Sequence, residues 1–116
     1  MLNATFLRLR EDAVPLLREW LDGLAVRSDE LFATYDAEGT RHEQFFLLRD
    51  GVGPVLVLVT ELHDRDSGSR TFLASDMPLA VEFKRIIQQV TDGPAPCELV
   101  FDSARLPDAP EDAHGG

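Results

Sequence analysis

The chain has 116 residues, 44% of them hydrophobic, and 21 acidic against 11 basic residues give it a formal net charge of −10. This length fits one domain that buries most of its apolar surface, and the composition excludes a chain that is disordered throughout. The electric field of a negatively charged protein repels phosphate backbones and anionic lipid surfaces. We therefore expect neither nucleic acid nor a membrane as the main partner.

Cysteine usage and the start of the chain both bear on the compartment. The single Cys97 cannot form an internal disulfide, which fits a reducing environment. The first residues lack the apolar segment of a secretion signal, and no run approaches the roughly 20 apolar residues of a membrane span. We expect a soluble cytoplasmic protein.

The first half of the chain predicts a strand followed by one long helix. Residues 3–9 alternate as a strand does, with Leu7 and Leu9 on one face and Phe6 on the other. Asp12 is a candidate N-cap, and the helix that follows spans about six to seven turns with Gly23 as its weakest point. Glu38-Gly39 ends it. Its apolar stripe consists of Val14, Leu17, Leu21, Leu24, Leu31 and Tyr35.

Residues 40–62 predict a β-hairpin whose turn is Asp50-Gly51-Val52-Gly53. The runs on either side, Phe45 to Leu48 and Val55 to Val59, do not alternate apolar with polar residues. Both faces of this hairpin therefore need covering.

The second half of the chain predicts a polar loop over 64–69, one helical turn around Phe72, and a second helix that starts at Ser75-Asp76-Met77-Pro78. A last strand is predicted at Cys97–Asp102, where Cys97 is expected to be an inert core residue. We place one domain at residues 1–104 and a disordered acidic tail at residues 105–116.

The order strand, helix, strand, strand, helix, strand is that of an α+β, ferredoxin-like βαββαβ sandwich. A four-stranded antiparallel sheet then carries two helices on one face and leaves the other face bare. We expect a second copy of the chain to cover it, which gives a homodimeric α+β barrel. The alternative is that the tail or a long loop folds over this face. Its apolar residues are Phe6, Phe46, Leu48, Val55, Val57 and Val59.

Five short segments are informative through their order and spacing: Phe6-Leu7-Arg8-Leu9, Leu17-Arg18-Glu19-Trp20-Leu21, Asp36-Ala37-Glu38-Gly39, Glu43 with Phe45-Phe46-Leu47, and Ser75-Asp76-Met77-Pro78. In these segments the chain resembles a bacterial family of uncharacterised small domains with the dimeric α+β barrel fold. The resemblance covers about residues 5–91, and Met77 stands where members tend to have His before the Pro. It implies the fold and a homodimer.

One candidate site lies at the polar end of the hairpin. Pairing Arg49 with Pro54 sets His42 opposite Glu61 and Thr40 opposite His63. His42, Glu61 and His63 would then share the barrel-facing side, where two imidazoles and a carboxylate can hold a metal or move a proton. The alternative is that they are polar residues at strand ends, and we assign no metal.

Glu43 and Trp20 are the other candidates. Glu43 is expected on the helix-facing side, as a desolvated general base or as the partner of an Arg near the edge of the layer. Trp20 lies on the long helix, either in the core or against a ligand.

Two functions remain open at this point. The first is a homodimer that is non-enzymatic or binds a small apolar ligand; the second is a cofactor-independent monooxygenase- or isomerase-type enzyme acting on a small apolar or aromatic substrate. No cofactor motif is recognised in either case. A cavity lined by His42, Glu43, Glu61 or Trp20 would favour a ligand or a substrate, and a fully packed interior would favour dimerisation alone.

Overall fold

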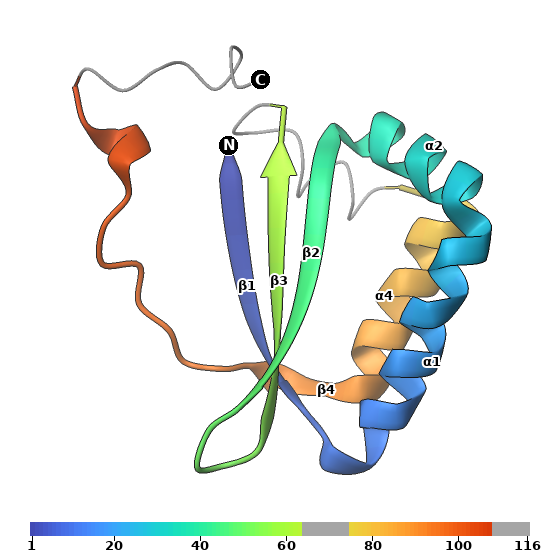
Figure 1. Cartoon of the computed structure of the whole chain (residues 1–116), viewed down its shortest axis with the longest axis horizontal. Helices are drawn as coiled ribbons and strands as arrows, with labels where there is room; N and C mark the ends of the chain where they lie inside the picture. The colour runs from blue at the N-terminus through green and yellow to red at the C-terminus, as the bar shows by residue number, and fades with distance from the viewer. Residues whose placement is uncertain (64–74, 108–116) are drawn as a thin grey trace.

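The computed structural model describes residues 1–63 and 75–107 as two layers, a sheet and a set of helices that covers one of its faces (Figure 1). The sheet is antiparallel, with strand order β2-β3-β1-β4, which confirms the α+β ferredoxin-like class. The predicted loop at 64–69, the turn around Phe72 and residues 108–116 lie outside the described residues. The strands are β1 (Leu2–Leu9), β2 (Thr40–Arg49), β3 (Pro54–Leu62) and β4 (Thr91–Pro94), and the α-helices are α1 (Val14–Leu24), α2 (Ser28–Glu38) and α4 (Pro78–Val90).

The single long helix predicted before the hairpin is two helices, α1 and α2, joined by a 3-10 turn at Ala25–Arg27. Arg27 has φ −118° and ψ 30°, outside helical values, and its side chain pairs with Glu30 and with Glu82 of α4. The interruption turns α2 towards the start of β2 (Figure 1). Asp12 is not the N-cap of α1, which is Ala13 without a capping side chain.

The hairpin forms with the predicted turn and with nearly the predicted register. Arg49 pairs with Pro54 and His42 with Glu61, as expected. Thr40, however, pairs with Leu62 rather than with His63, because β2 carries one extra residue between Thr40 and His42. Such a bulge turns the residues beyond it to the other face of the sheet, so Thr40 faces the helices.

The strand predicted at Cys97–Asp102 does not form. The chain passes straight from α4 into β4, which pairs with β1 only around Leu7 and Leu9. Ala95 N still donates to the Phe6 carbonyl at 2.8 Å, and beyond Ala95 the chain leaves the sheet (Figure 1), so Cys97 is exposed instead of lying in the core. We call residues 96–107 the arm.

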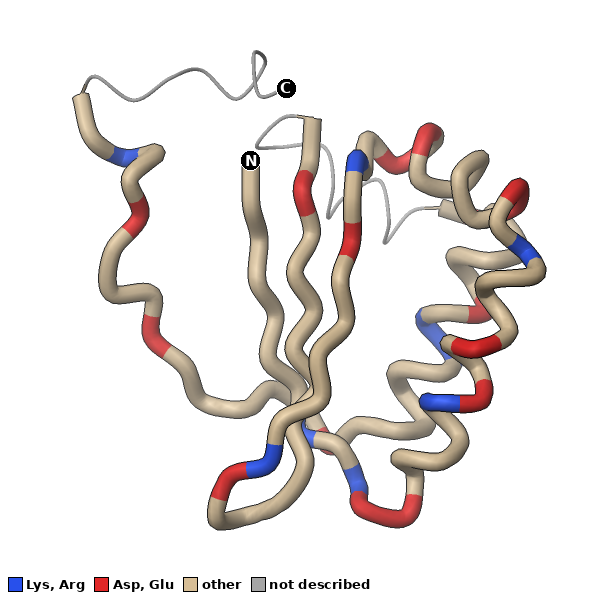
Figure 2. Tube along the Cα trace, in the orientation of Figure 1, with Lys and Arg blue, Asp and Glu red and all other residues tan. Residues whose placement is uncertain are grey.

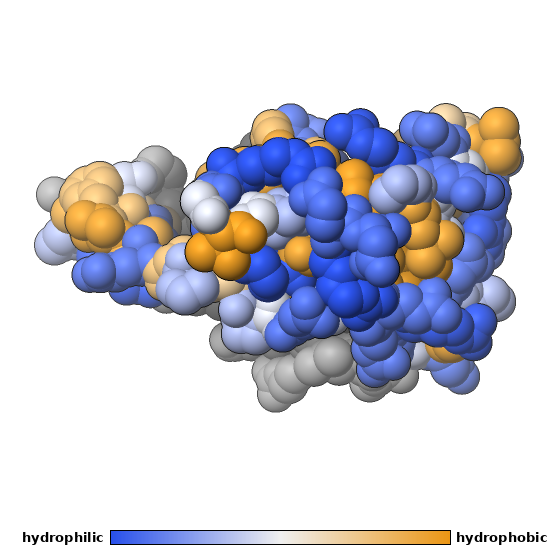
Figure 3. Space-filling model, turned by 90° about the horizontal axis from the view of Figure 1, so that it is seen from below, coloured by the Kyte–Doolittle hydropathy of each residue, from blue (hydrophilic) through white to orange (hydrophobic). Residues whose placement is uncertain are grey.

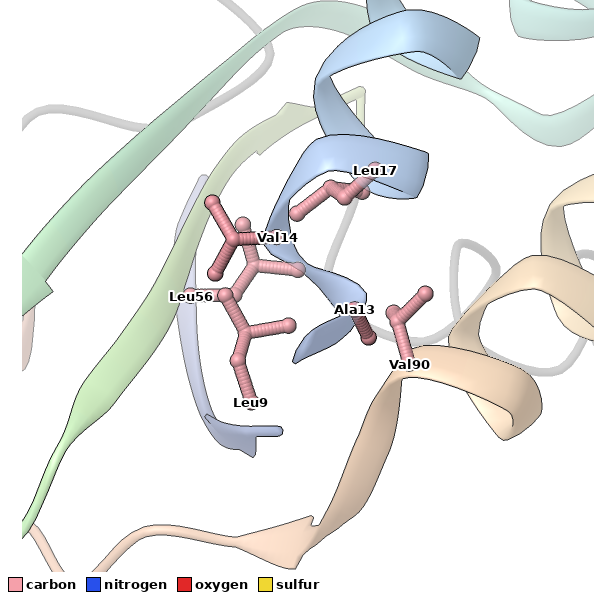
Figure 4. Close-up of a cluster of buried hydrophobic side chains, with 6 residues drawn as sticks. All are labelled: Leu9, Ala13, Val14, Leu17, Leu56 and Val90. Carbon is pink, nitrogen blue, oxygen red and sulfur yellow. The ribbon is translucent and has the colours of Figure 1, made fainter. Parts of the chain in front are cut away.

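The core occupies one end of the space between the layers. There Leu9 and Leu56 of the sheet meet the start of α1 and Val90 at the end of α4 (Figure 4). Leu56 is 1% exposed and Val90 is completely buried. These residues hold α1 and α4 on the sheet and leave the other end of the interlayer space to a different set of side chains.

The sheet face away from the helices carries the predicted apolar residues and is only partly bare. Val55 and Val57 are buried, because Ala95 packs on them together with Phe6 and Val59. Phe46 and Leu48 remain 49% and 42% exposed. Charges are distributed differently over the two layers: acidic and basic residues recur along the helices, whereas the middle of the strands has few (Figure 2).

Within the part of the chain that is described, no helix is long and apolar enough to cross a membrane.

Candidate functional site

A cavity of about 220 Å³ lies between the sheet and the helices, at the end of the sandwich where β1 begins and β3 ends. It is thus at the opposite end from the packed cluster of Leu9, Leu56 and Val90. Leucines and aromatic residues from all three α-helices line it, and so do threonines of the sheet. The lining is mainly apolar with a few polar groups, which is the composition typical of small-molecule sites.

Three aromatic side chains form one wall of the cavity. Trp20 of α1 stacks on Phe83 of α4 with ring centroids 5.3 Å apart and an interplanar angle of 3°. Phe45 of β2 meets Phe83 edge-on, with a centroid distance of 5.7 Å and an angle of 84°. These geometries add specific aromatic attraction to apolar burial, so the wall is held as a unit.

The outer side of this wall is fixed by hydrogen bonds around Glu82. Trp20 Nε1 donates to Glu82 Oε1 at 2.6 Å, and Arg27 Nη1 donates to the same oxygen at 2.8 Å. Arg27 also donates to both oxygens of Glu30 at 3.0 Å. Hydrogen bonds from Arg27 and Trp20 lower the pKa of the Glu82 carboxyl. The interruption between α1 and α2 therefore places Arg27 where it holds the Glu82 carboxylate, and that carboxylate in turn holds the indole ring of Trp20.

The polar side of the cavity is built around Glu43. Its Oε1 accepts a hydrogen bond from the Tyr35 hydroxyl at 3.0 Å, and its Oε2 accepts one from Thr60 Oγ1 at 3.2 Å. Burial raises the pKa of Glu43, and the two hydrogen bonds act against that rise. Burial together with the charge of Glu43 also raises the pKa of Tyr35, which stays a protonated donor.

Glu38, the last residue of α2, is the second carboxyl in the cavity lining. Its side chain is 7% exposed, and its buried Oε1 accepts no hydrogen bond from any residue in the described ranges. Burial, and then the charge of Glu43, raise its pKa to about 7, while Lys84 acts in the opposite direction. A carboxyl of this kind exists as both acid and carboxylate near neutral pH, so it can donate, accept or transfer a proton.

The comparisons with known proteins place the chain in a family without assigning it an activity. A model described as a family of unknown function (DUF6176) matches residues 2–108. The chain belongs to this family. No curated protein and no solved structure matches the chain. An uncharacterised family was expected, and the match is to one; the match does not itself name a dimeric α+β barrel. The cavity is the starting point for function in this DUF6176 chain.

Of the residues singled out in the sequence, Glu43 and Trp20 line the cavity. Glu43 is bound by Tyr35 and Thr60, and Arg41 pairs with Glu61 instead, with Arg41 Nε 3.7 Å from Glu61 Oε1. Of the five candidate residues, Glu43 and Trp20 are therefore the two that lie at the same site.

The three residues at the polar end of the hairpin lie elsewhere. His42 and Glu61 are paired across the strands on the face away from the helices, and His42 is exposed. His63 is exposed just beyond β3, and its backbone N–H donates to the carbonyl of Gly39 at 2.9 Å. In the described ranges no group of three or more His, Cys, Asp or Glu side chains is arranged to hold a metal ion.

Sequence reasoning missed Glu38 and Tyr35 as site residues. The pattern indicates Glu38 as the end of the helix, and it indicates Tyr35 as an aromatic of the apolar stripe that belongs to the core or an interface rather than to a ligand site. A signal was present, because Leu31, Tyr35 and Glu38 follow four- and three-residue spacing. A carboxylate on the buried stripe of a helix is a candidate functional group by that position alone.

Proposed function

We propose that this protein binds a small, mainly apolar molecule in the cavity between the sheet and the helices. The observation that carries the proposal is the cavity itself, which survives between two layers that pack tightly at their other end. A cavity of about 150 Å³ lined by apolar side chains holds a benzene molecule. A space of about 220 Å³ therefore suits a single ring with a short substituent.

Propylbenzene is a suitable first probe, and Leu31→Trp is a variant that fills the cavity. Leu31 of α2 lines the cavity, whereas its neighbour Phe32 is 63% exposed. We expect propylbenzene to shift the methyl NMR signals of Leu79 and Ile87, and Leu31→Trp to raise its Kd at least tenfold. Phe32→Trp is the matched control and should leave the Kd unchanged. Propylbenzene shifts that are spread over the surface, or that persist in Leu31→Trp, would contradict binding in the cavity.

A second candidate function is a cofactor-independent enzyme of the isomerase type. It is favoured by Glu38, a buried carboxyl whose pKa is about 7 and whose Oε1 accepts no hydrogen bond from the described residues. Its carboxylate would take a proton from a carbon next to a carbonyl. The resulting carboxylic acid would exchange that proton with water and then give a proton back to the same or another carbon, so that no other reactant is consumed. Incorporation of solvent deuterium into cyclohexanone, lost in Glu38→Gln, would support this reaction; its absence would leave binding as the function.

The assembly we propose is a homodimer formed through the open sheet face, that is, a dimeric α+β barrel. Phe46 and Leu48 are exposed on that face, and the arm carries Val100 and Phe101 at 85% and 70% exposure. The arm projects from the rest of the molecule and carries hydrophobic residues on its surface (Figure 3). Large apolar side chains that are exposed together on a surface often mark an interaction site. A second copy provides the complementary surface, because the arm of one chain can lie over Phe46 and Leu48 of the other.

A further inference from the structure

The two carboxyls in the cavity differ in how the protein satisfies them. Each oxygen of Glu43 has its own donor, the Tyr35 hydroxyl or the Thr60 hydroxyl. Glu38 Oε1 has none among the described residues, although the side chain is more than nine-tenths buried. A buried acceptor without a donor destabilises the folded protein, and more strongly when it is charged. This atom is therefore a place where a bound molecule can supply the missing donor.

The charges around Glu38 indicate the kind of donor. The described residues that line the cavity include two carboxyls and no Lys, Arg or His. Glu43 raises the pKa of Glu38 through its charge; Tyr35, on the same helix, is a neutral donor to Glu43; and Lys84, on α4, acts on Glu38 in the opposite sense while donating to the Ser75 carbonyl at 2.9 Å. A carboxylate or phosphate ligand would meet repulsion here. A cation would reduce the repulsion between the two carboxyls.

We propose that the ligand is a small aromatic or alicyclic amine whose ammonium group donates a hydrogen bond to Glu38 Oε1. This inference rests on the proposed binding function and names the chemical class of the ligand. The ring packs against the wall of Trp20, Phe83 and Phe45, whose faces also attract cations. A charge-assisted bond to a carboxylate is shorter and stronger than a neutral one, so the ammonium is bound better than a hydroxyl of the same size. The net charge of −10 further concentrates cations near the protein.

Four compounds of similar size separate the ring from the charge: 2-phenylethylamine, 2-phenylethanol, propylbenzene and 3-phenylpropionate. We expect the full chain at about pH 8 to bind the amine at least tenfold more tightly than propylbenzene, and to bind the carboxylate most weakly. Glu38→Gln should lower the affinity for the amine about tenfold and leave that for propylbenzene unchanged. Glu19→Gln, at an exposed position of α1, is the matched control and should change neither.

A pH titration of the unmodified protein tests the same contact without relying on a variant. The pKa of Glu38 is about 7, so affinity for the amine should fall as the pH drops through that value, while affinity for propylbenzene stays constant. Equal binding of amine and propylbenzene, or a pH-independent affinity for the amine, would overturn the inference and leave the proposed binding function standing. Failure of all four compounds to bind would overturn both.

Discussion

At the scale of single residues, Glu38 is the cavity carboxyl whose Oε1 accepts no hydrogen bond from the described residues. Packing its carboxyl between α2 and the sheet raises its pKa from 4.5 to about 7, first by burial and then by the charge of Glu43. Its position in the last turn of α2 adds to this, because the helix dipole disfavours a negative charge there. A carboxyl kept under such conditions is typical of functional sites, where stability is traded for a tuned proton affinity.

The raised pKa of Glu38 predicts how stability changes with pH. Between about pH 4.5 and pH 7 the folded chain keeps a proton that the unfolded chain has lost, so the free energy of unfolding falls as the pH rises across this window. One pKa unit corresponds to about 1.4 kcal/mol. Water that reaches the carboxyl through the cavity screens its charge, so we expect the free energy of unfolding to fall by roughly 2 kcal/mol across this window.

Glu38→Gln removes this titration. We expect the variant to be more stable than the unmodified chain at about pH 8, by roughly 2 kcal/mol, and to lose this advantage at about pH 4. Urea unfolding at a series of pH values measures the difference. A constant difference between the two proteins at every pH would show that Glu38 does not titrate as described.

At the scale of elements, the junction between α2 and β2 sets the geometry of the cavity. Gly39 caps α2 with φ 74° and ψ 22°, a left-handed conformation that disfavours side chains. Gly39→Ala should therefore lower the free energy of unfolding by about 1 kcal/mol. Gly51→Ala, in the hairpin turn, is the control: its added methyl group would contact nothing within 4 Å, and Gly51 does not have a positive φ. Urea unfolding of both variants checks the prediction; equal losses would contradict it.

The elements also show what local sequence determines here. The first strand, the hairpin with its turn at Asp50–Gly53, the helix that follows it and the pairing of His42 with Glu61 follow from alternation, spacing and turn residues, and all of these are present. The break at Ala25–Arg27 was not predicted, because it is stabilised by Arg27 contacting Glu82 on a helix far along the chain. The bulge before His42 was missed for a related reason, since one inserted residue leaves the hydrophobic pattern nearly unchanged.

In the candidate site, too, local sequence predicts the position of a residue but not its contacts with distant segments. Glu43 was placed on the correct face by its register, but its partners Tyr35 and Thr60 come from a helix and from another strand. The cavity depends on how completely side chains from several elements fill a space, and no local pattern encodes that. The predicted last strand was wrong because alternation alone does not make a strand: residues 97–102 alternate, yet no strand in the described ranges pairs with them.

At the scale of the whole molecule, that unpaired alternation points to a second chain. Leu99, Val100 and Phe101 are all exposed on the arm, while Ala95 just before them is buried against Val55 and Val57. The chain thus starts to cover the open sheet face and then leaves it. Isolated exposed apolar residues are common, but a contiguous group on a projecting segment is unfavourable in a monomer.

The predicted dimer is tested by placing a charge in each half of the proposed contact. Phe101→Asp in the arm and Phe46→Asp on the sheet face should each raise the dimer dissociation constant at least tenfold in analytical ultracentrifugation. Val26→Asp is the matched control: Val26 is 87% exposed on the helical side of the molecule, outside the contact, and its substitution should leave the dimer intact.

Salt gives an independent test, because each chain carries a net charge of −10 and two like-charged chains repel. Raising the ionic strength screens this repulsion while apolar burial persists, so the dimer should become tighter as salt is added. A dimer held by ion pairs would become weaker instead. A chain that stays monomeric at micromolar concentration and high salt would contradict the assembly, and the open face would then require another cover.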